Sequence, residues 1–429
     1  MSDESLLSAY RRRISGFSKN ARLFTIASTA AAVAGSLYSL LFNLYLLAVG
    51  YSTGFLGLLV SLSSIASVVF AVPVGRLATV MGHRRLMLVA AAATAVVMLA
   101  QVMWPSPAVL IVGTILAAME NTALSVVGGP FMTENSTPEE RAHLFTIQGA
   151  LGMASGVAGN ILGGALPVVI AAVTGWRPQD PQALKYAMLG GILVLFVPVL
   201  WPLWEIRATT EKETGVYAAP GPAAEDGKKG IGNVLGRALG LVQPVLVFKL
   251  ALPSLVTSLG AGLIVPFFNV FYQNLGGEPG TIGLIFAAQS VLTALAYLVA
   301  PVLAARWGKV HMVSYVQVAS VPFLLAMALA PGLWWAAGWG LIRNALMNMA
   351  NPISSTFSME ILAPQERAAA NGVFTIAWSL GWAVASPIAG LLMETVSYRA
   401  SYWPAAVLYL AGAAINLWFF GHYDRLQHA

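Results

Sequence analysis

Residues 75–85 read Gly-Arg-Leu-Ala-Thr-Val-Met-Gly-His-Arg-Arg, a short basic segment between two long apolar runs, 53–74 and 84–104. A helix needs about 20 apolar residues to cross the hydrocarbon core of a bilayer. Each run has about that length, so the segment is predicted to be a loop that joins two membrane-spanning helices at one membrane surface. Apolar runs of the same kind continue along the chain on both sides of it.

The composition of the whole chain also indicates a membrane protein. Apolar residues make up 58% of the 429 residues and charged residues 9%, whereas roughly 25% of a typical soluble domain is charged. A soluble chain of this length would present more Lys, Glu and Asp to water, so a lipid bilayer is the expected surroundings. The chain has no cysteine, which excludes disulfides, thiolate metal sites and cysteine nucleophiles.

Twelve apolar runs are long enough to span a membrane, and they predict an all-α protein with two pseudo-symmetric six-helix bundles. A polar stretch divides the chain into an N-terminal bundle (1–206), a cytoplasmic linker (207–243) and a C-terminal bundle (244–429). Apolar residues at helical spacing at the end of this linker predict a short amphipathic helix on the membrane surface; an unstructured tether is the alternative. The expected spans are 23–49, 53–74, 84–104, 107–132, 141–173, 185–206, 244–275, 280–303, 309–330, 333–359, 366–396 and 401–421.

Lysine and arginine are distributed unequally between the loops on the two sides of the predicted spans. One side holds only Arg177, Lys185 and Arg399, and the positive-inside rule places the other side, with both termini, in the cytoplasm. We therefore expect a multi-pass protein of a bacterial-type inner (plasma) membrane. Because the basic residues are dispersed over membrane-flanking loops, the net charge of +6 does not indicate nucleic-acid binding.

The chain matches itself at a shift of 226 residues. Compositional bias alone would match Ala and Leu, whereas here Asn, Glu, Pro and Arg recur. Two parallel six-helix repeats related by an axis along the membrane normal form a transporter architecture whose substrate site lies near the midplane. The matches include Phe42-Asn43 with Phe268-Asn269, Gly82 with Gly308, Glu134 with Glu360, Glu140 with Glu366 and Arg141 with Arg367.

Residues 75–85 resemble the G-x-L-A-D-R-x-G-R-R signature of the major facilitator superfamily. The helix number, the long central loop and the repeat resemble that family over almost the whole chain. In the family the signature helps to lock the outward-facing state, and by position that role carries over to Gly75, Gly82, Arg84 and Arg85. Thr79 stands where the signature has Asp, and simple positive-inside anchoring is the alternative for the two arginines.

Two ionisable residues lie near the middle of predicted spans, where each costs roughly 2.5–3.5 kcal/mol on insertion scales. Glu120 lies in the span 107–132 and Arg343 in its repeat partner, 333–359; in the resembled family both of these spans line the central cavity. We expect the two residues to bind substrate or to couple protons, and a structural ion pair is the alternative. The polar residues expected beside them in the cavity are Asn121, Asn344, Asn348, Asn43, Asn269 and Gln273.

Further charged residues recur at the expected cytoplasmic ends of spans. Glu134 and Arg141 in the first half correspond to Glu360 and Arg367 in the second. We expect them to form salt bridges between the halves that close an inner gate; solvated loop positions are the alternative. Trp378 and Trp382, one helical turn apart, either stack on a substrate or pack against lipid and the core.

Together these features predict a secondary active transporter that moves a small organic solute by alternating access, coupled to protons. Export by antiport is favoured by a loose similarity of the glycine-rich span 141–173 to the fifth-helix motif of proton-coupled drug exporters, although its Gly-Pro pair is missing and close helix packing is the preferred alternative for these glycines. A proton symporter or a facilitative uniporter for uptake is the alternative, and a transporter-like sensor is a third. The sequence has no P-loop and no nucleophile–base constellation in its spans, so we expect no enzyme. The expected partners are a small-molecule substrate, protons and the lipid bilayer, for a monomer without cofactor or metal.

Overall fold

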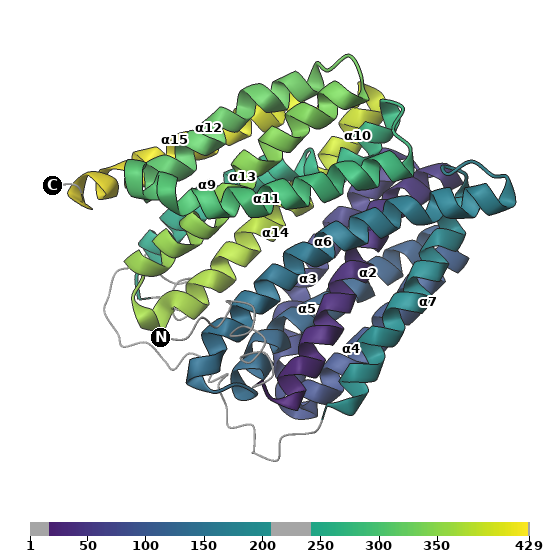
Figure 1. Cartoon of the computed structure of the whole chain (residues 1–429). Coiled ribbons are helices and arrows are strands. Elements are labelled where there is room, and N and C mark those ends of the chain that lie inside the picture. The colour runs from purple at the N-terminus through teal and green to yellow at the C-terminus, as the bar shows by residue number, and fades with distance from the viewer. Residues whose placement is uncertain (1–16, 207–241, 428–429) are drawn as a thin grey trace, which may run out of the picture. The chain divides into compact units, whose positions relative to one another are not determined.

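The computed structural model describes residues 17–206 and 242–427, which Figure 1 shows as long helices joined by short connections. The predicted amphipathic helix of the linker lies almost wholly outside these residues. The helices are α2 (Lys19–Val49), α3 (Thr53–Met81), α4 (His83–Met103), α5 (Pro107–Glu134), α6 (Pro138–Thr174), α7 (Pro181–Glu205), α9 (Pro244–Gly262), η1 (Val265–Phe267), α10 (Phe268–Asn274), α11 (Pro279–Trp307), α12 (Lys309–Ala328), α13 (Leu333–Ile361), η2 (Pro364–Glu366), α14 (Arg367–Thr395) and α15 (Tyr402–Gln427).

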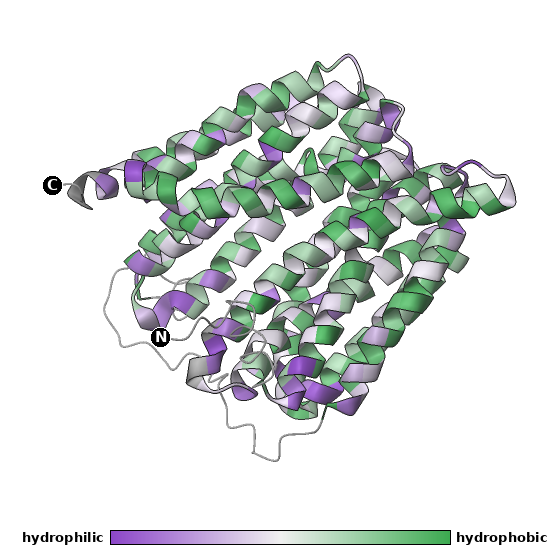
Figure 2. Ribbon diagram, viewed as in Figure 1, coloured by the Kyte–Doolittle hydropathy of each residue, from purple (hydrophilic) through white to green (hydrophobic). Residues whose placement is uncertain are grey.

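The predicted all-helical membrane fold is confirmed. The part of the chain that the structure describes contains twelve long helices when α9, η1 and α10 are counted as one interrupted helix. Eleven of these are long and apolar enough to cross a bilayer, and the exception is α13, which carries Arg343 and several asparagines. Figure 2 shows hydrophobic residues along most of the helices and hydrophilic residues gathered at many of their ends.

The loop predicted over residues 75–85 is mostly helical. Helix α3 continues to Met81 and α4 begins at His83, so only Gly82 separates them. Gly82 has a φ of 78°, a backbone conformation that glycine adopts without the penalty of a side chain. Gly308, with a φ of 84°, separates α11 from α12 in the same way, so the two halves repeat this helix junction.

The span predicted over 244–275 is interrupted in the middle. Helix α9 ends at Gly262 and the chain resumes helical structure at η1, which contains Pro266. Proline has no backbone N–H and leaves a carbonyl oxygen of the preceding turn without its helical partner. Two side chains satisfy carbonyl oxygens at this break: Ser386 donates to the oxygen of Gly262 at 3.2 Å, and Asn43 to that of Pro266 at 2.8 Å.

The described helices form two compact units. The first contains residues 17–42 and 69–206, and the second contains residues 43–68 and 242–427. In the first unit, Gly159 and Gly163 of α6 lie directly against α2, where a side chain at Gly159 would run into the carbonyl oxygen of Val33. Small residues allow such close approach between membrane helices. The domain boundaries predicted at 206 and 243 stay a prediction.

In the second unit, residues 53–68 of α3 pack closely on α14. Thr53 donates to the carbonyl oxygen of Gly390 at 3.0 Å, and Ser61 donates to that of Ala383 at 2.6 Å. A side chain at Gly57 would collide with the carbonyl oxygen of Ser386. We call this region the α3–α14 contact.

Candidate functional site

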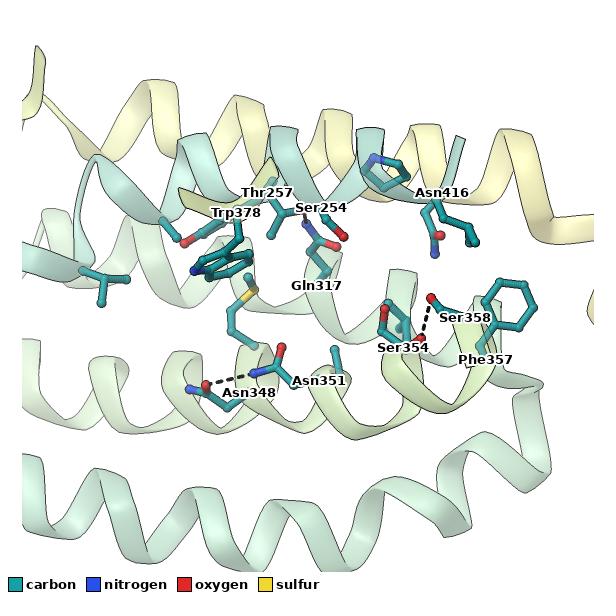
Figure 3. Close-up of a pocket in the computed structure, with 18 of the residues that line it drawn as sticks. Ser254, Thr257, Gln317, Asn348, Asn351, Ser354, Phe357, Ser358, Trp378 and Asn416 are labelled. Carbon is teal, nitrogen blue, oxygen red and sulfur yellow. Dashed lines mark hydrogen bonds between the residues drawn. The ribbon is translucent and has the colours of Figure 1, made fainter. Parts of the chain in front are cut away.

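A cavity of about 290 Å³ lies inside the second unit. Ligand sites in proteins commonly have volumes of roughly 300–1,000 Å³, so this cavity has room for a small molecule. Helices α9, α12, α13, α14 and α15 all contribute to its wall, and Figure 3 shows polar side chains converging on it from opposite sides. The polar residues that line it are Ser254, Thr257, Gln317, Asn344, Asn348, Asn351, Ser354, Ser358 and Asn416.

One wall of the cavity is a row of amide side chains on α13. Asn344, Asn348 and Asn351 follow one another at helical spacing, which brings them onto one face of the helix. Asn348 donates from Nδ2 to Oδ1 of Asn344 at 3.0 Å, and Asn344 donates to the Thr293 hydroxyl at 3.0 Å. Asn351 donates to Oδ1 of Asn348 at 3.4 Å. These bonds orient the amides, which have further donors and acceptors to offer a solute.

Aromatic and polar side chains form the other wall. Trp378 of α14 is 41% exposed, and in Figure 3 its ring points toward Asn348 and Asn351. Trp382 lies one turn farther along and also lines the cavity. Its buried Nε1 has no hydrogen-bond partner within the described residues. An indole ring opposite a row of amides can contact the flat face of a solute while the amides bind its hydroxyl groups.

Arg343 also lines this cavity, although only 2% of its surface is exposed. It donates a hydrogen bond from an Nη atom to the hydroxyl of Tyr409 on α15. Its guanidinium carbon lies 5.3 Å from the ring centroids of both Phe268 and Tyr409, within the range of a cation–π interaction. The Nε atom has no partner among the residues that the structure describes.

Glu120 belongs to the first unit and is 4% exposed. Its carboxyl group lies beside the Thr94 hydroxyl of α4, and its Oε2 atom has no hydrogen-bond partner within residues 17–206 and 242–427. Its neighbour Asn121 lines a separate cavity of about 410 Å³ in the same unit, together with Ser28 and Gln148. Glu120 and Arg343 each contact residues of their own unit. A direct ion pair between them stays the untested alternative.

The remaining predicted cavity residues are found elsewhere in the second unit. Asn43 donates to Oδ1 of Asn269, its counterpart in the repeat, at 3.3 Å. Asn269 is buried, and Gln273 is half-buried on α10. None of the three lines the cavity in the second unit. Asn43 contacts the interruption between α9 and α10 through its bond to the carbonyl oxygen of Pro266, and Asn269 lies in the first turn of α10.

Two predicted gating glutamates form equivalent side-chain contacts with a basic residue within their own units. The Glu134 carboxylate lies 3.1 Å from Nδ1 of His83. Glu360 pairs with Lys309, and both residues of this pair are 226 positions beyond their counterparts. Each pair joins the start of one helix to the end of another. The repeat therefore extends to a specific side-chain contact.

The other predicted gating residues bind backbone or face open space. Arg84 donates to the carbonyl oxygen of Trp204 at 2.7 Å, and Arg85 is exposed. Arg141 donates to the carbonyl oxygen of Thr133 at 3.1 Å, and Arg367 to that of Leu362 at 3.2 Å. A side chain at Gly75 would meet no neighbouring atom within 4 Å. Salt bridges between the halves remain a prediction.

The sequence analysis does not identify several residues that line the cavity or contact Arg343. Gln317 and Asn416 are polar residues inside apolar spans, so the criterion that singles out Asn348 would also have found them. Phe268 and Tyr409 have no such signal, because aromatic residues are common throughout these helices. Their role as neighbours of Arg343 depends on how α10, α13 and α15 pack.

Comparisons with known proteins agree with this architecture. The family model described as Major Facilitator Superfamily matches residues 24–248 and 250–428. Sugar efflux transporter A of Dickeya chrysanthemi is 25% identical over 136 residues, which is 32% of this chain and 34% of that protein. The chain thus matches about a third of the length of this curated relative.

Solved structures of transporters share the fold. A mutant of the nucleoside transporter NupG superposes with a TM-score of 0.72 at 13% identity, covering 94% of this chain and 100% of that one. A bacterial homologue of the human lysosomal transporter Spinster gives 0.71 at 14% identity, with 97% of each chain covered. A D-xylose-proton symporter gives 0.67 at 13%, with 95% of this chain and 97% of that one.

Proposed function

We propose, since this chain belongs to the Major Facilitator Superfamily, that it is a secondary transporter that exports a small hydroxyl-rich organic solute in exchange for protons. The solute moves by alternating access through a multi-pass protein of a bacterial-type inner membrane. Both termini face the cytoplasm, and the protein works as a monomer.

The cavity in the second unit carries this proposal. Its volume of about 290 Å³ suits a molecule of the size of a monosaccharide, and amides line one wall while Trp378 and Trp382 line another. Hydroxyl groups both donate and accept hydrogen bonds, so a row of amides matches them without regard to charge. The partial similarity to a sugar efflux transporter agrees with a sugar-like solute and with export.

Glu120 is the proposed proton carrier. It is a carboxyl group inside a membrane span, 4% exposed, with one oxygen unpartnered among the described residues. A charged carboxylate in such surroundings is costly, and intramembrane carboxyl groups serve as proton relays in transporters. A change in its surroundings during the cycle would let it bind a proton on one side and release it on the other.

The test uses purified protein in proteoliposomes that are loaded with a radiolabelled aldose. An imposed pH gradient should drive net aldose flux, and Glu120→Gln should abolish that flux but leave aldose exchange at zero gradient. Glu205→Gln is the matched control, because Glu205 pairs with Lys19 near the end of α7. If Glu120→Gln retains gradient-driven flux, Glu120 is not the carrier. If no solute of the sugar class is moved under any gradient, the proposed function is wrong.

A further inference from the structure

Arg343 places a permanent positive charge in the interior of the second unit. Its side chain is 2% exposed, and a guanidinium group stays protonated in proteins. Burying a charge away from water is costly unless an opposite charge or a full set of hydrogen bonds compensates it. The contacts of Arg343 show how much of that compensation the chain itself supplies.

The compensation from the second unit is incomplete. A guanidinium has five N–H donors, and the structure gives Arg343 a hydrogen bond to the Tyr409 hydroxyl while its Nε atom lacks a partner within the described residues. The rings of Phe268 and Tyr409 flank the group at 5.3 Å. Such cation–π contacts hold the guanidinium in place, but neither ring brings a negative charge.

The wall of the adjoining cavity does not supply a negative charge either. Among the described residues that line it, Arg343 is the sole carrier of a formal charge. The rest of the lining consists of amides, hydroxyls, aromatic rings and apolar side chains. A molecule that enters this cavity therefore meets one positive charge, fixed at a wall, beside neutral hydrogen-bonding groups.

We infer that the solute carries an anionic oxygen group, a carboxylate or a phosphate, that binds Arg343 while its hydroxyl groups contact the α13 amides. This inference deepens the proposed function and rests on it, because it assigns the substrate class of the same cavity as small acidic sugars. The planar guanidinium suits both anions, which accept two parallel N–H bonds from it.

Matched pairs of ligands isolate the charge. Binding to the purified protein is measured by titration calorimetry with D-glucuronate, D-galacturonate and D-mannuronate, each compared with its uncharged amide of nearly the same shape. The acids should bind roughly ten- to a hundredfold more tightly than the amides, as expected for hydrogen bonds to a charged group. Glucose 6-phosphate, compared with glucose, distinguishes a phosphate from a carboxylate as the recognised group.

Variants connect the preference to Arg343. Arg343→Gln should remove the preference for acid over amide, whereas Arg343→Lys keeps the charge and should retain a weakened preference. Arg306→Gln is the control, since Arg306 is an exposed arginine in the last turn of α11 and loses the same charge. The Lys variant keeps the comparison informative if the Gln variant is poorly folded.

Three results would overturn the inference. These are no binding of any acid, equal binding of acid and amide, or an acid preference that survives in Arg343→Gln. Recovery of thermal stability in the double variant Glu120→Gln/Arg343→Gln, relative to both single variants, would assign the counter-charge to Glu120 and would also overturn the inference.

Arg343-dependent acid binding without flux in proteoliposomes would contradict the proposed transport alone. Flux of neutral sugars without preference for acids would defeat the inference alone.

Discussion

Trp378 is the residue whose position most directly links the cavity wall to solute shape. It is 41% exposed on α14 and faces Asn348 and Asn351 across the cavity (Figure 3). In the proposed transporter its ring covers one face of the bound solute, and its removal would leave that face in contact with water. The amide row would still bind the hydroxyl groups. Aromatic contact and hydrogen bonding are thus contributed by different helices.

Trp378→Ala is expected to weaken solute binding by roughly tenfold, because an aromatic contact contributes about 0.5–1.5 kcal/mol beyond the area it buries. Calorimetric titration of the purified variant with the solute that the wild type binds most tightly measures the loss. Trp334→Ala is the control, since Trp334 is a more exposed tryptophan at the start of α13 that does not line the cavity. Equal losses in the two variants would mean that Trp378 has no special role in the cavity.

Some residues of the cavity can be identified from the sequence and others cannot. Arg343 and Asn348 stand out because polar groups in an apolar span are costly and need a reason to be there. Both residues line the cavity in the second unit. Tyr409 binds Arg343, but a tyrosine in a span has many roles and carries no signal by itself. Its contact with Arg343 depends on how α13 and α15 are arranged around α12, which the pattern of residues does not reveal.

At the scale of the element, the α3–α14 contact is a close interface that the proposed alternating access would have to accommodate. Carbonyl oxygens of α14 accept hydrogen bonds from Thr53 and Ser61, and Gly57 lets the two helices approach closely. Small residues let membrane helices approach closely, and each hydroxyl hydrogen bond between them contributes modestly, on average about 0.6 kcal/mol. Such a contact suits helices that come apart and meet again in each cycle.

Gly57→Val is expected to open the α3–α14 contact, because overpacking a close interface costs typically about 1–3 kcal/mol. The chain has no cysteine, so Ser61→Cys provides a unique thiol that is buried in the contact. Its reaction with a small thiol reagent should become several-fold faster when Gly57→Val is added. Gly338→Val is the control, because a side chain there would meet no atom within 4 Å. An unchanged rate would show that the contact tolerates the extra volume.

Helix ends are less predictable than helix existence. Each span expected from hydropathy corresponds to an observed helix, but α3 runs through most of the predicted loop as far as Met81. The polar residues of that segment indicated a loop, whereas a helix can extend beyond the hydrocarbon core into the polar interface. The position of Gly82 marks the true junction. Pro266 indicates that backbone hydrogen bonding is interrupted after Gly262, but a proline alone does not specify a break, because Pro73 lies inside the continuous helix α3.

At the scale of the whole molecule, the charge distribution of the loops predicts how the protein is oriented. Gln179 lies in the α6–α7 connection and Gln365 in η2, and both are exposed. By the positive-inside rule the first faces away from the cytoplasm and the second faces into it. In intact cells a membrane-impermeant maleimide should label Gln179→Cys, and should label Gln365→Cys only after the membrane is permeabilised. The reverse pattern would show that the predicted orientation is wrong.

The repeat explains why so much of the architecture can be predicted from one sequence. A constant shift of 226 residues relates Gly82 to Gly308 and Glu134 to Glu360, and the structure repeats the helix junction and the glutamate contact with a basic residue at those positions. The candidate cavity is not repeated in this way, since Arg343 and Glu120 have no charged counterparts. The repeated positions belong to the helical scaffold, whereas the two buried charged residues each occur in one half only.

The interruption between α9 and α10 bears on how the C-terminal half could move in the proposed transport cycle. Its repeat counterpart, α2, is one continuous helix from Lys19 to Val49, whereas the later helix contains a break whose carbonyl oxygens are held by Ser386 and Asn43. Residues at such breaks absorb changes in backbone angles during conformational change. The C-terminal half can therefore bend at this break, whereas α2 has no corresponding break. In the proposed transport cycle, backbone changes would then be concentrated at this break rather than in α2.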